Sequence, residues 1–315
     1  MNQANAVKIA NWLYEIWPYY LLNEHTRTSI PQSTDNPVRN KLRASKLHDC
    51  AKKVAAEQRK LIEKLPITLE VARKFDLGVR VAESVQEAID FGVKQQTFPI
   101  AVTFESDNRH ENEYMSGTPD CVLWVEGDCV PIEIKHTEAW EGFYWTQVLQ
   151  IIGYMQLYNA NCGILYTVNP NLSAEVSHNV YIVMASDDQE GWYLYDRDGK
   201  PVVSHSKFTS KTWNGTVYFT RYDYNEMVRR HQYWMDEIAK YYNTSMVPDD
   251  IDYMEDNRCG EFIQPQFYQR NQGEYKKGDQ KPGTGVFKIR CPLAKYCYPE
   301  LNIQDGDTEV VWSAK

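Results

Sequence analysis

The stretch GTPDCVLWVEGDCVPIEIK, residues 117–135, decides which fold this sequence predicts. Two short runs rich in Val, Ile and Trp flank a Glu-Gly-Asp turn at 126–128, a pattern typical of a β-hairpin. If the chain reverses at Glu126–Gly127, Asp120 on one strand lies opposite Glu133 on the other. A turn centred one residue later would shift this register, but both registers bring the two carboxylates close together.

Alternation along a strand predicts which of these side chains share a face. Residues two apart point to the same side, so Glu133 and Lys135 project together while Ile132 and Ile134 point into the core. Two neighbouring carboxylates repel unless a cation compensates, and Mg²⁺ or Mn²⁺ prefers oxygen ligands. An adjacent lysine can orient or deprotonate a metal-bound water and stabilise charge on the phosphate. The alternative without a functional site is a common Thr-Pro-Asp turn beside a solvent-exposed Glu-x-Lys strand face.

The spacing of these residues resembles that of a known nuclease family. GTPD (117–120) followed by EIK (133–135) resembles the PD-(D/E)XK nuclease superfamily. The next expected helix contains QVLQIIGYMQLY (147–158), in which Gln150 and Tyr154 match the Q-x-x-x-Y element of the RecB-type branch. These two residues lie one turn apart on one helical face, and Gln147 on the same face is a second candidate.

The resemblance implies a role for each matching residue. It makes Asp120, Glu133, Lys135, Gln150 and Tyr154 the catalytic residues. It also implies that Asp120, Glu133 and the main-chain carbonyl of Ile134 hold the Mg²⁺ or Mn²⁺ ion.

An upstream helix in this family carries a further acidic metal ligand. The matching segment here is LGVRVAE (77–83), which assigns that role to Glu83, with Glu87 one turn later as the rival. Ala82 stands where a metal-binding histidine is common, so the resemblance implies a site with fewer protein ligands.

The seven cysteines are an odd number, which favours free thiols or metal ligands over a disulfide framework. Cys291 and Cys297 follow a polar, Gly-rich segment at 269–285, and Cys50 lies far upstream. This arrangement resembles the iron–sulfur nucleases of CRISPR adaptation and of AddAB-type recombination, whose pattern expects another cysteine at Lys288. Cys259 is the candidate replacement.

The implied iron–sulfur ligands are therefore Cys50, Cys259, Cys291 and Cys297, holding a [4Fe–4S] rather than a [2Fe–2S] cluster. The alternatives are Zn²⁺ and ordinary buried thiols without metal. The other three cysteines lie in or beside expected strands and are interpreted as core packing: Cys121, Cys129 and Cys162.

The expected architecture is an α/β fold with a restriction-endonuclease-like core. A central mixed sheet is flanked by helices, with a helical N-terminal region and a C-terminal cysteine-containing tail. The proposed boundaries are 1–66, 67–245 for the nuclease core with inserted strands, and 246–315. Helices are expected over the first 25 residues with a break near Pro18, and over 42–64 (or from Ser45), 67–92, 138–160 and 223–242; strands are expected at 97–106, 121–127, 128–135, 163–168, 179–185, 191–196 and 215–221.

Composition limits the classes of function. A net charge of −9 and a pI of 5.4 argue against nucleic-acid binding through bulk positive charge. The sequence contains no apolar run of about 18 residues, which would be needed to span a membrane, and no secretory signal. We expect a cytoplasmic protein of a bacterium, archaeon or phage-infected cell.

The resemblance thus implies a metal-dependent DNA exonuclease that processes single-stranded or duplex ends in recombination or CRISPR adaptation. Its expected partners are DNA and a recombination or CRISPR-adaptation protein. Two alternatives remain open. One is a nuclease like the phage lambda exonuclease without a cluster, and the other is a nuclease-fold protein that binds DNA or a partner without cutting.

Overall fold

A computed structural model describes residues 1–23, 41–49, 51–58, 69–95, 100–104, 107–137, 142–169, 177–188, 190–202, 211–213 and 216–240. The chain divides into two compact units. The first consists of Met1–Asp35, Arg43–His48 and Asp76–Val228, and the second of Asn36–Leu42, Asp49–Phe75 and Arg229–Lys315. The first unit contains the central sheet and the candidate site.

The central sheet has eight strands in the order β10-β11-β9-β8-β7-β6-β5-β2. Only β6 and β7 run parallel, and every other neighbouring pair is antiparallel. In chain order its strands are β2 (Ile100–Phe104), β5 (Cys121–Val125), β6 (Asp128–His136), β7 (Cys162–Val168), β8 (His178–Ala185), β9 (Gly191–Asp196), β10 (Lys211–Trp213) and β11 (Thr216–Thr220). A small sheet of order β1-β4-β3 contains β1 (Leu42–Arg43), β3 (His110–Glu111) and β4 (Met115–Gly117).

The described helices include one that joins the two parallel strands. This helix is α4 (Trp145–Tyr158), the crossover that a parallel β6–β7 pair requires. The others are α1 (Gln3–Asn23), the 3₁₀ turn η1 (Ala44–Lys46), α2 (Ala51–Gln58), α3 (Leu69–Lys94) and α5 (Arg221–Lys240). Within the described part of the chain, no helix combines the length and apolar character needed to cross a membrane.

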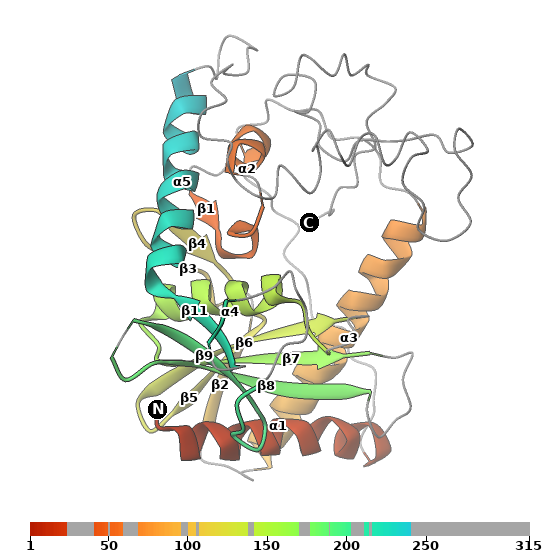
Figure 1. Ribbon diagram of the computed structural model, residues 1–315. Coiled ribbons are helices and arrows are strands. Elements are labelled where there is room, and N and C mark those ends of the chain that lie inside the picture. Colours follow the sequence, from red (N-terminus) through yellow and green to blue (C-terminus); the bar gives the residue numbers. More distant parts are fainter. Residues whose placement is uncertain are drawn as a thin grey trace, which may run out of the picture. The chain divides into compact units, whose positions relative to one another are not determined.

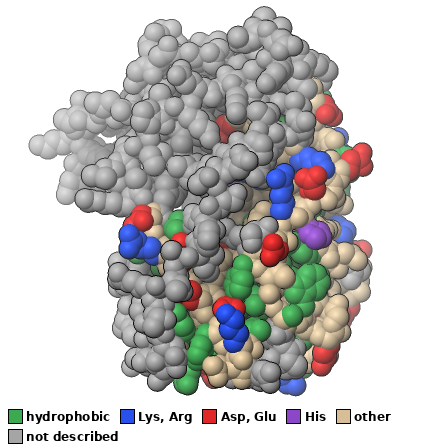
Figure 2. All heavy atoms as spheres, turned by 180° about the vertical axis from the view of Figure 1, so that it is seen from behind, with side chains coloured by type: hydrophobic (Ala, Val, Ile, Leu, Met, Phe, Trp, Pro, Cys, Tyr) green, Lys and Arg blue, Asp and Glu red, His purple; other side chains and the backbone are tan. Residues whose placement is uncertain are grey.

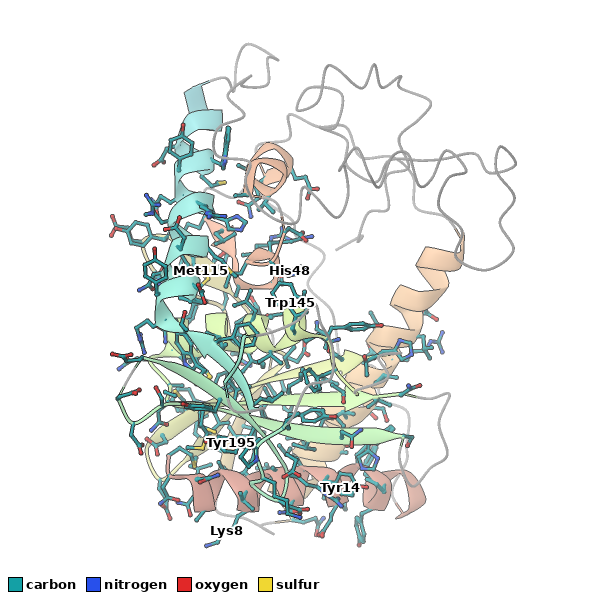
Figure 3. The ribbon with its side chains drawn as sticks, viewed as in Figure 1. Lys8, Tyr14, His48, Met115, Trp145 and Tyr195 are labelled. Atoms are coloured by element: carbon teal, nitrogen blue, oxygen red, sulfur yellow. The ribbon has the colours of Figure 1, made fainter. Side chains whose placement is uncertain are left out.

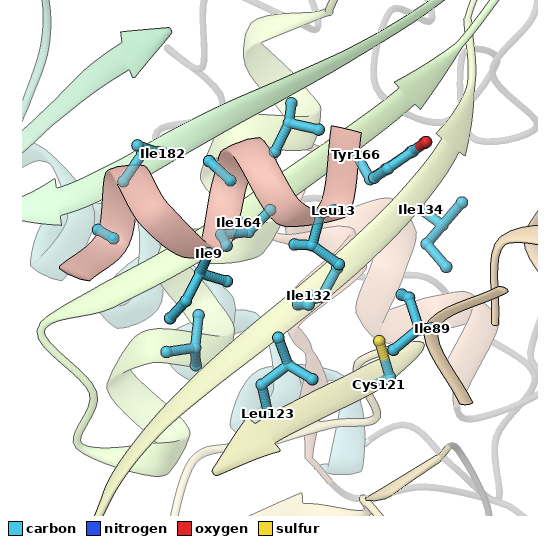
Figure 4. Packing of buried hydrophobic residues seen from close by; sticks show 14 of the residues in the cluster. Ile9, Leu13, Ile89, Cys121, Leu123, Ile132, Ile134, Ile164, Tyr166 and Ile182 are labelled. Carbon is cyan, nitrogen blue, oxygen red and sulfur yellow. The ribbon is translucent and has the colours of Figure 1, made fainter. Parts of the chain in front are cut away.

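Helices cover both faces of the central strands, so the expected α/β class is confirmed (Figure 1). On one face, Ile132 and Ile134 of β6 pack with Ile9 and Leu13 of α1 and with Ile89 of α3 (Figure 4). The other face is covered by α4, which contacts β6 and β7.

The β5–β6 hairpin has the register that corresponds to a turn at Glu126–Gly127. Cys121 pairs with Ile132 and Val125 with Asp128, so the next positions outward are Asp120 and Glu133. The turn residues Glu126 and Gly127 both have positive φ angles, 52° and 89°, as a type I′ hairpin turn requires. The predicted opposition of Asp120 and Glu133 is confirmed.

Helix α1 continues through Pro18, so the expected break there is wrong. Proline has no N–H to give to the carbonyl four residues earlier, which here belongs to Tyr14. The Nε2–H of buried His178 donates to that carbonyl instead, at 2.9 Å. A donor from β8 therefore replaces the hydrogen bond that the helix lacks.

Two further helices differ from expectation in where they begin. The segment expected as a helix from 42 or 45 forms β1 and η1 first, and α2 begins only at Ala51. Gly142 has a φ of 81°, a left-handed conformation that does not continue a helix, and α4 begins at Trp145 rather than at 138. The helix expected over 67–92 is confirmed as α3.

Candidate active site

Asp120 lies directly before the first residue of β5 and is almost fully buried, with 7% of its surface exposed. Its Oδ2 accepts a hydrogen bond of 2.6 Å from the main-chain N–H of Ile134. Its carbonyl oxygen accepts one of 2.9 Å from Nε2 of Gln86 on α3. The carboxylate thus extends the β5–β6 ladder by one position, and this fixes its orientation.

Glu133 and Lys135 lie on the α4 face of β6, as the alternation predicts. Glu133 is only 1% exposed, and its Oε1 forms an ion pair with the ammonium of Lys135, which is 27% exposed. Burying a carboxylate is costly unless it is paired and hydrogen-bonded. The ammonium lowers this cost and places a positive charge beside the carboxylate.

Helix α4 adds the two residues of the Q-x-x-x-Y element to this group. Gln150 donates from Nε2 to Oε1 of Glu133 at 2.6 Å and to the hydroxyl of Tyr154 at 2.7 Å. Burial, followed by the negative charges of Glu133 and Asp120, holds the pKa of Tyr154 well above its usual value. The phenol therefore stays protonated at neutral pH, and both carboxylates lie near enough to influence it.

Gly117, the first residue of GTPD, makes room for the ring of Tyr154. A Cβ atom at this position would lie 2.7 Å from Cε1 of Tyr154, closer than packed carbon atoms approach. The first and last elements of the motif are thus in direct contact, which the sequence spacing alone did not indicate.

Gln147, the second candidate on α4, has a different position. Its Oε1 accepts a hydrogen bond of 2.8 Å from the main-chain N–H of Tyr144, and so caps the first turn of the helix. Gln150 and not Gln147 is the glutamine that contacts Glu133.

Helix α3 reaches Asp120 through a residue that the sequence analysis missed. Gln86 makes this contact, whereas Glu87 accepts a hydrogen bond of 3.1 Å from the hydroxyl of Tyr20 on α1. Glu83 lies half-buried one turn before Gln86, and its assignment as a metal ligand stays a prediction. The sequence signal for Gln86 was an amide side chain next to the apolar positions Val85 and Ala88, which indicates a polar residue on the buried face of the helix.

The residues present suit a hard divalent cation. Asp120 and Glu133 provide two buried carboxylates, and the main-chain carbonyl of Ile134 lies between Glu133 and Lys135 in the chain. Among the described residues, no group of three His, Cys, Asp or Glu side chains could hold a metal ion. Two carboxylates fit Mg²⁺, which is commonly bound by one or two carboxylates together with water and substrate phosphate.

The cysteines fall into two sets. The four expected iron–sulfur ligands, Cys50, Cys259, Cys291 and Cys297, lie outside the described residues. Cys121 and Cys162 are buried thiols in the apolar core, as expected. Burial raises the pKa of Cys162 to about 12. Cys129 is half-buried, and its Sγ donates to the carbonyl of Tyr158.

Among the described residues visible in Figure 2, surface charge does not mark a binding face. Acidic and basic side chains are interspersed there among the described residues. Figure 3 shows Trp145 on the α4 side of the sheet, the side on which Glu133 and Lys135 lie. Lys8 lies on the opposite side, on α1.

Comparisons with known proteins give structural likeness at low sequence identity. No protein-family profile matches the chain, and a search of curated proteins finds no match. A phage-related exonuclease from Haemophilus somnus 129PT is similar with 15% identity and a TM-score of 0.37, covering 64% of this chain and 95% of that one. An alkaline exonuclease from Laribacter hongkongensis is similar with 12% identity and a TM-score of 0.40, covering 64% and 91%. Its complex with dAMP gives 9% identity and a TM-score of 0.36, covering 70% and 94%.

Proposed function

We propose that this chain is a metal-dependent deoxyribonuclease that hydrolyses phosphodiester bonds. The observation that supports this most is the meeting of Asp120, Glu133 and Lys135 on one hairpin, with Gln150 of α4 donating to Glu133. Buried charged groups contribute little net stability, so a chemical role explains their presence better than a structural one.

Each residue has a distinct part in this proposal. Asp120, Glu133 and the carbonyl of Ile134 would hold Mg²⁺ or Mn²⁺, which when bound polarises the scissile phosphate and acidifies a water molecule. Lys135, which forms an ion pair with Glu133, would keep a positive charge next to the attacking water and the phosphate. Gln150 holds the carboxylate of Glu133 in one orientation, and protonated Tyr154 accepts the second hydrogen bond of Gln150.

The finer proposal is exonucleolytic processing of single-stranded or duplex DNA ends, in recombination or CRISPR adaptation and with a protein of one of those pathways. It follows the RecB-type pattern of Gln150 and Tyr154. The −9 net charge means that attraction to DNA would come from the bound cation and local groups such as Lys135 rather than from the whole surface.

The proposal is tested by incubating the protein with end-labelled linear DNA and with covalently closed circles of the same sequence. We expect linear DNA to be degraded with Mg²⁺ or Mn²⁺ and left intact with EDTA. Lys135→Met should reduce the rate by roughly 10²–10³-fold because it removes charge stabilisation of the transition state. Lys8→Met is the matched control, because Lys8 is exposed on α1 at the opposite face of the sheet.

Each other outcome points to a different conclusion. Cleavage that survives in Lys135→Met would place the active site elsewhere. Cutting of closed circles would indicate an endonuclease. Binding of DNA without any degradation would favour the alternative of a nuclease-fold protein that binds DNA without cutting.

The iron–sulfur assignment is a separate part of the proposal, supported by the sequence pattern of Cys50, Cys259, Cys291 and Cys297. Protein purified without oxygen should contain stoichiometric iron and absorb visible light, and Cys291→Ser should lose both properties. Cys129→Ser is the control, because this thiol already donates to the carbonyl of Tyr158. Colourless wild-type protein without bound iron would favour the lambda-exonuclease-like alternative.

A further inference from the structure

Asp120 lies at a position where the described strand ladders have ended. The β2–β5 ladder finishes at the pair Phe104–Cys121 and the β5–β6 ladder at Cys121–Ile132. Asp120 is nevertheless buried, so its main-chain carbonyl needs a donor from outside these ladders. A buried carbonyl left without a donor destabilises the folded state.

Gln86 supplies that donor from a rigid element. Its side chain is 5% exposed, and its Nε2 lies 2.9 Å from the carbonyl oxygen of Asp120. The adjacent Val85 and the following Ile89 are fully buried in the core against the sheet. The amide of Gln86 is therefore fixed by the packing of α3 and cannot easily follow a movement of Asp120.

The neighbours of Gln86 on the same helix make contacts of another kind. The hydroxyl of Ser84 accepts a hydrogen bond of 3.0 Å from Nε1 of Trp17, and Glu87 accepts one from Tyr20. Both partners belong to α1, so these bonds join two helices on the core side of the sheet. The bond from Gln86 instead joins α3 to a residue of the candidate metal site.

We propose that Gln86 is a positioning residue that sets the metal affinity of the site through the main chain of Asp120. The carbonyl is held by Gln86 and the carboxylate by the N–H of Ile134, so the two bonds together fix the orientation of the Asp120 side chain beside Glu133. This inference rests on the proposed function, because the bound cation is part of it. Loss of a group that orients a metal ligand typically weakens metal binding by about 10–100-fold.

The test is Mn²⁺ binding measured by electron paramagnetic resonance, which does not depend on catalysis. Gln86→Met keeps a side chain of similar length but removes the donor, and we expect its Kd for Mn²⁺ to rise by about 10–100-fold. The Mn²⁺ concentration that gives the half-maximal cleavage rate should rise by the same factor. At saturating Mn²⁺ the rate should approach that of wild type.

Ser84→Ala is the matched control. It removes the hydrogen bond between the same helix and α1, so it should lower the thermal stability while leaving the Kd for Mn²⁺ within about twofold. If Gln86→Met does not fold, Gln86→Leu replaces it, because leucine likewise offers no donor to the carbonyl and adds no charge beside the two carboxylates. The thermal midpoint of each variant shows which proteins are folded.

The failure of this inference differs from a failure of the proposed function. A folded Gln86→Met or Gln86→Leu protein with wild-type Mn²⁺ affinity would overturn the role of Gln86 alone. Wild-type protein whose Mn²⁺ binding is absent, or is unaffected by Asp120→Asn, would overturn the metal site itself.

Discussion

The two faces of strand β6 are both buried but are stabilised in different ways. On the α1 face, the side chains of Ile132 and Ile134 are 0% and 4% exposed and belong to the apolar core. On the α4 face, Glu133 is 1% exposed and is held by an ammonium and an amide. Burial of the isoleucines favours folding, whereas burial of the carboxylate opposes it. Equal burial therefore stabilises the fold on one face and, in the proposed function, serves the chemistry on the other.

The largest effect is expected on the apolar face. Ile132→Ala should lower the free energy of unfolding by about 2–5 kcal/mol, because it leaves a cavity between the sheet and the α1–α3 layer. Urea denaturation measures this loss. The cleavage rate per folded molecule should change little, and a large loss of rate in fully folded protein would show that the two faces are not separate.

The polar face is tested by two glutamines of α4, Gln150 and Gln147. Gln150→Ala removes the hydrogen bonds to Glu133 and Tyr154, and the cleavage rate should fall by roughly 10–100-fold, as for other groups that orient metal ligands. Gln147→Ala removes only the helix cap, which should cost up to about 1 kcal/mol of stability and leave the rate nearly unchanged. Equal loss of rate in both variants would contradict the assignment of Gln150.

The faces of β6, the register of the hairpin and the pairing of Gln150 with Tyr154 could all be predicted from the sequence. The period-two pattern of residues 132–135 gave the two faces of β6, and the positive-φ turn at Gly127 has the register that places Asp120 opposite Glu133. Spacing of four on a helix placed Gln150 and Tyr154 together. Each of these features depends on residues that are close together in the sequence, so the geometry of a single strand, turn or helix determines it.

The features that were missed depend on long-range contacts. Gln86 donates to a carbonyl 34 positions away. Because every residue has a main-chain carbonyl, the side chain at position 120 does not indicate that its carbonyl is the acceptor. Pro18 predicted a break in α1, but His178, 164 positions from Tyr14, supplies the missing donor. The sequence marks Gln86 as an amide among buried apolar positions, but it identifies neither the carbonyl that Gln86 contacts nor the one that His178 contacts.

A smaller effect is expected at the pairing of Pro18 with His178. His178→Leu should lower the free energy of unfolding by about 0.5–1.5 kcal/mol, because the partly buried carbonyl of Tyr14 loses a hydrogen bond. In the Pro18→Ala background the restored helical N–H can serve that carbonyl, so His178→Leu should cost less. A double-mutant cycle measures the difference; additive effects would mean that the two residues are not coupled.

The smallest effect is a dependence of stability on pH that His178 contributes. Burial lowers the pKa of His178, and the charge of Arg197 lowers it further against the opposing hydrogen bond to Tyr14. Its contribution is therefore complete above the unfolded-state pKa of about 6.5. It is lost as the pH falls from there toward the lower folded-state pKa, because the unfolded chain binds the proton more tightly. Urea midpoints between pH 7.5 and 5.5 should fall more steeply for wild type than for His178→Leu.

The most direct test of the central claim compares two glutamates of the same hairpin. Glu133 is buried on the α4 face, and Glu126 is exposed in the turn. Cleavage rate and free energy of unfolding are measured for Glu133→Gln and Glu126→Gln. Glu133→Gln should lose roughly 10³-fold in rate without a loss of stability, because a buried charge is removed and the partly exposed ammonium of Lys135 can be hydrated. Glu126→Gln should change neither quantity. A Glu133→Gln protein that cleaves DNA at nearly the wild-type rate, or that loses activity only because it unfolds, would contradict the account.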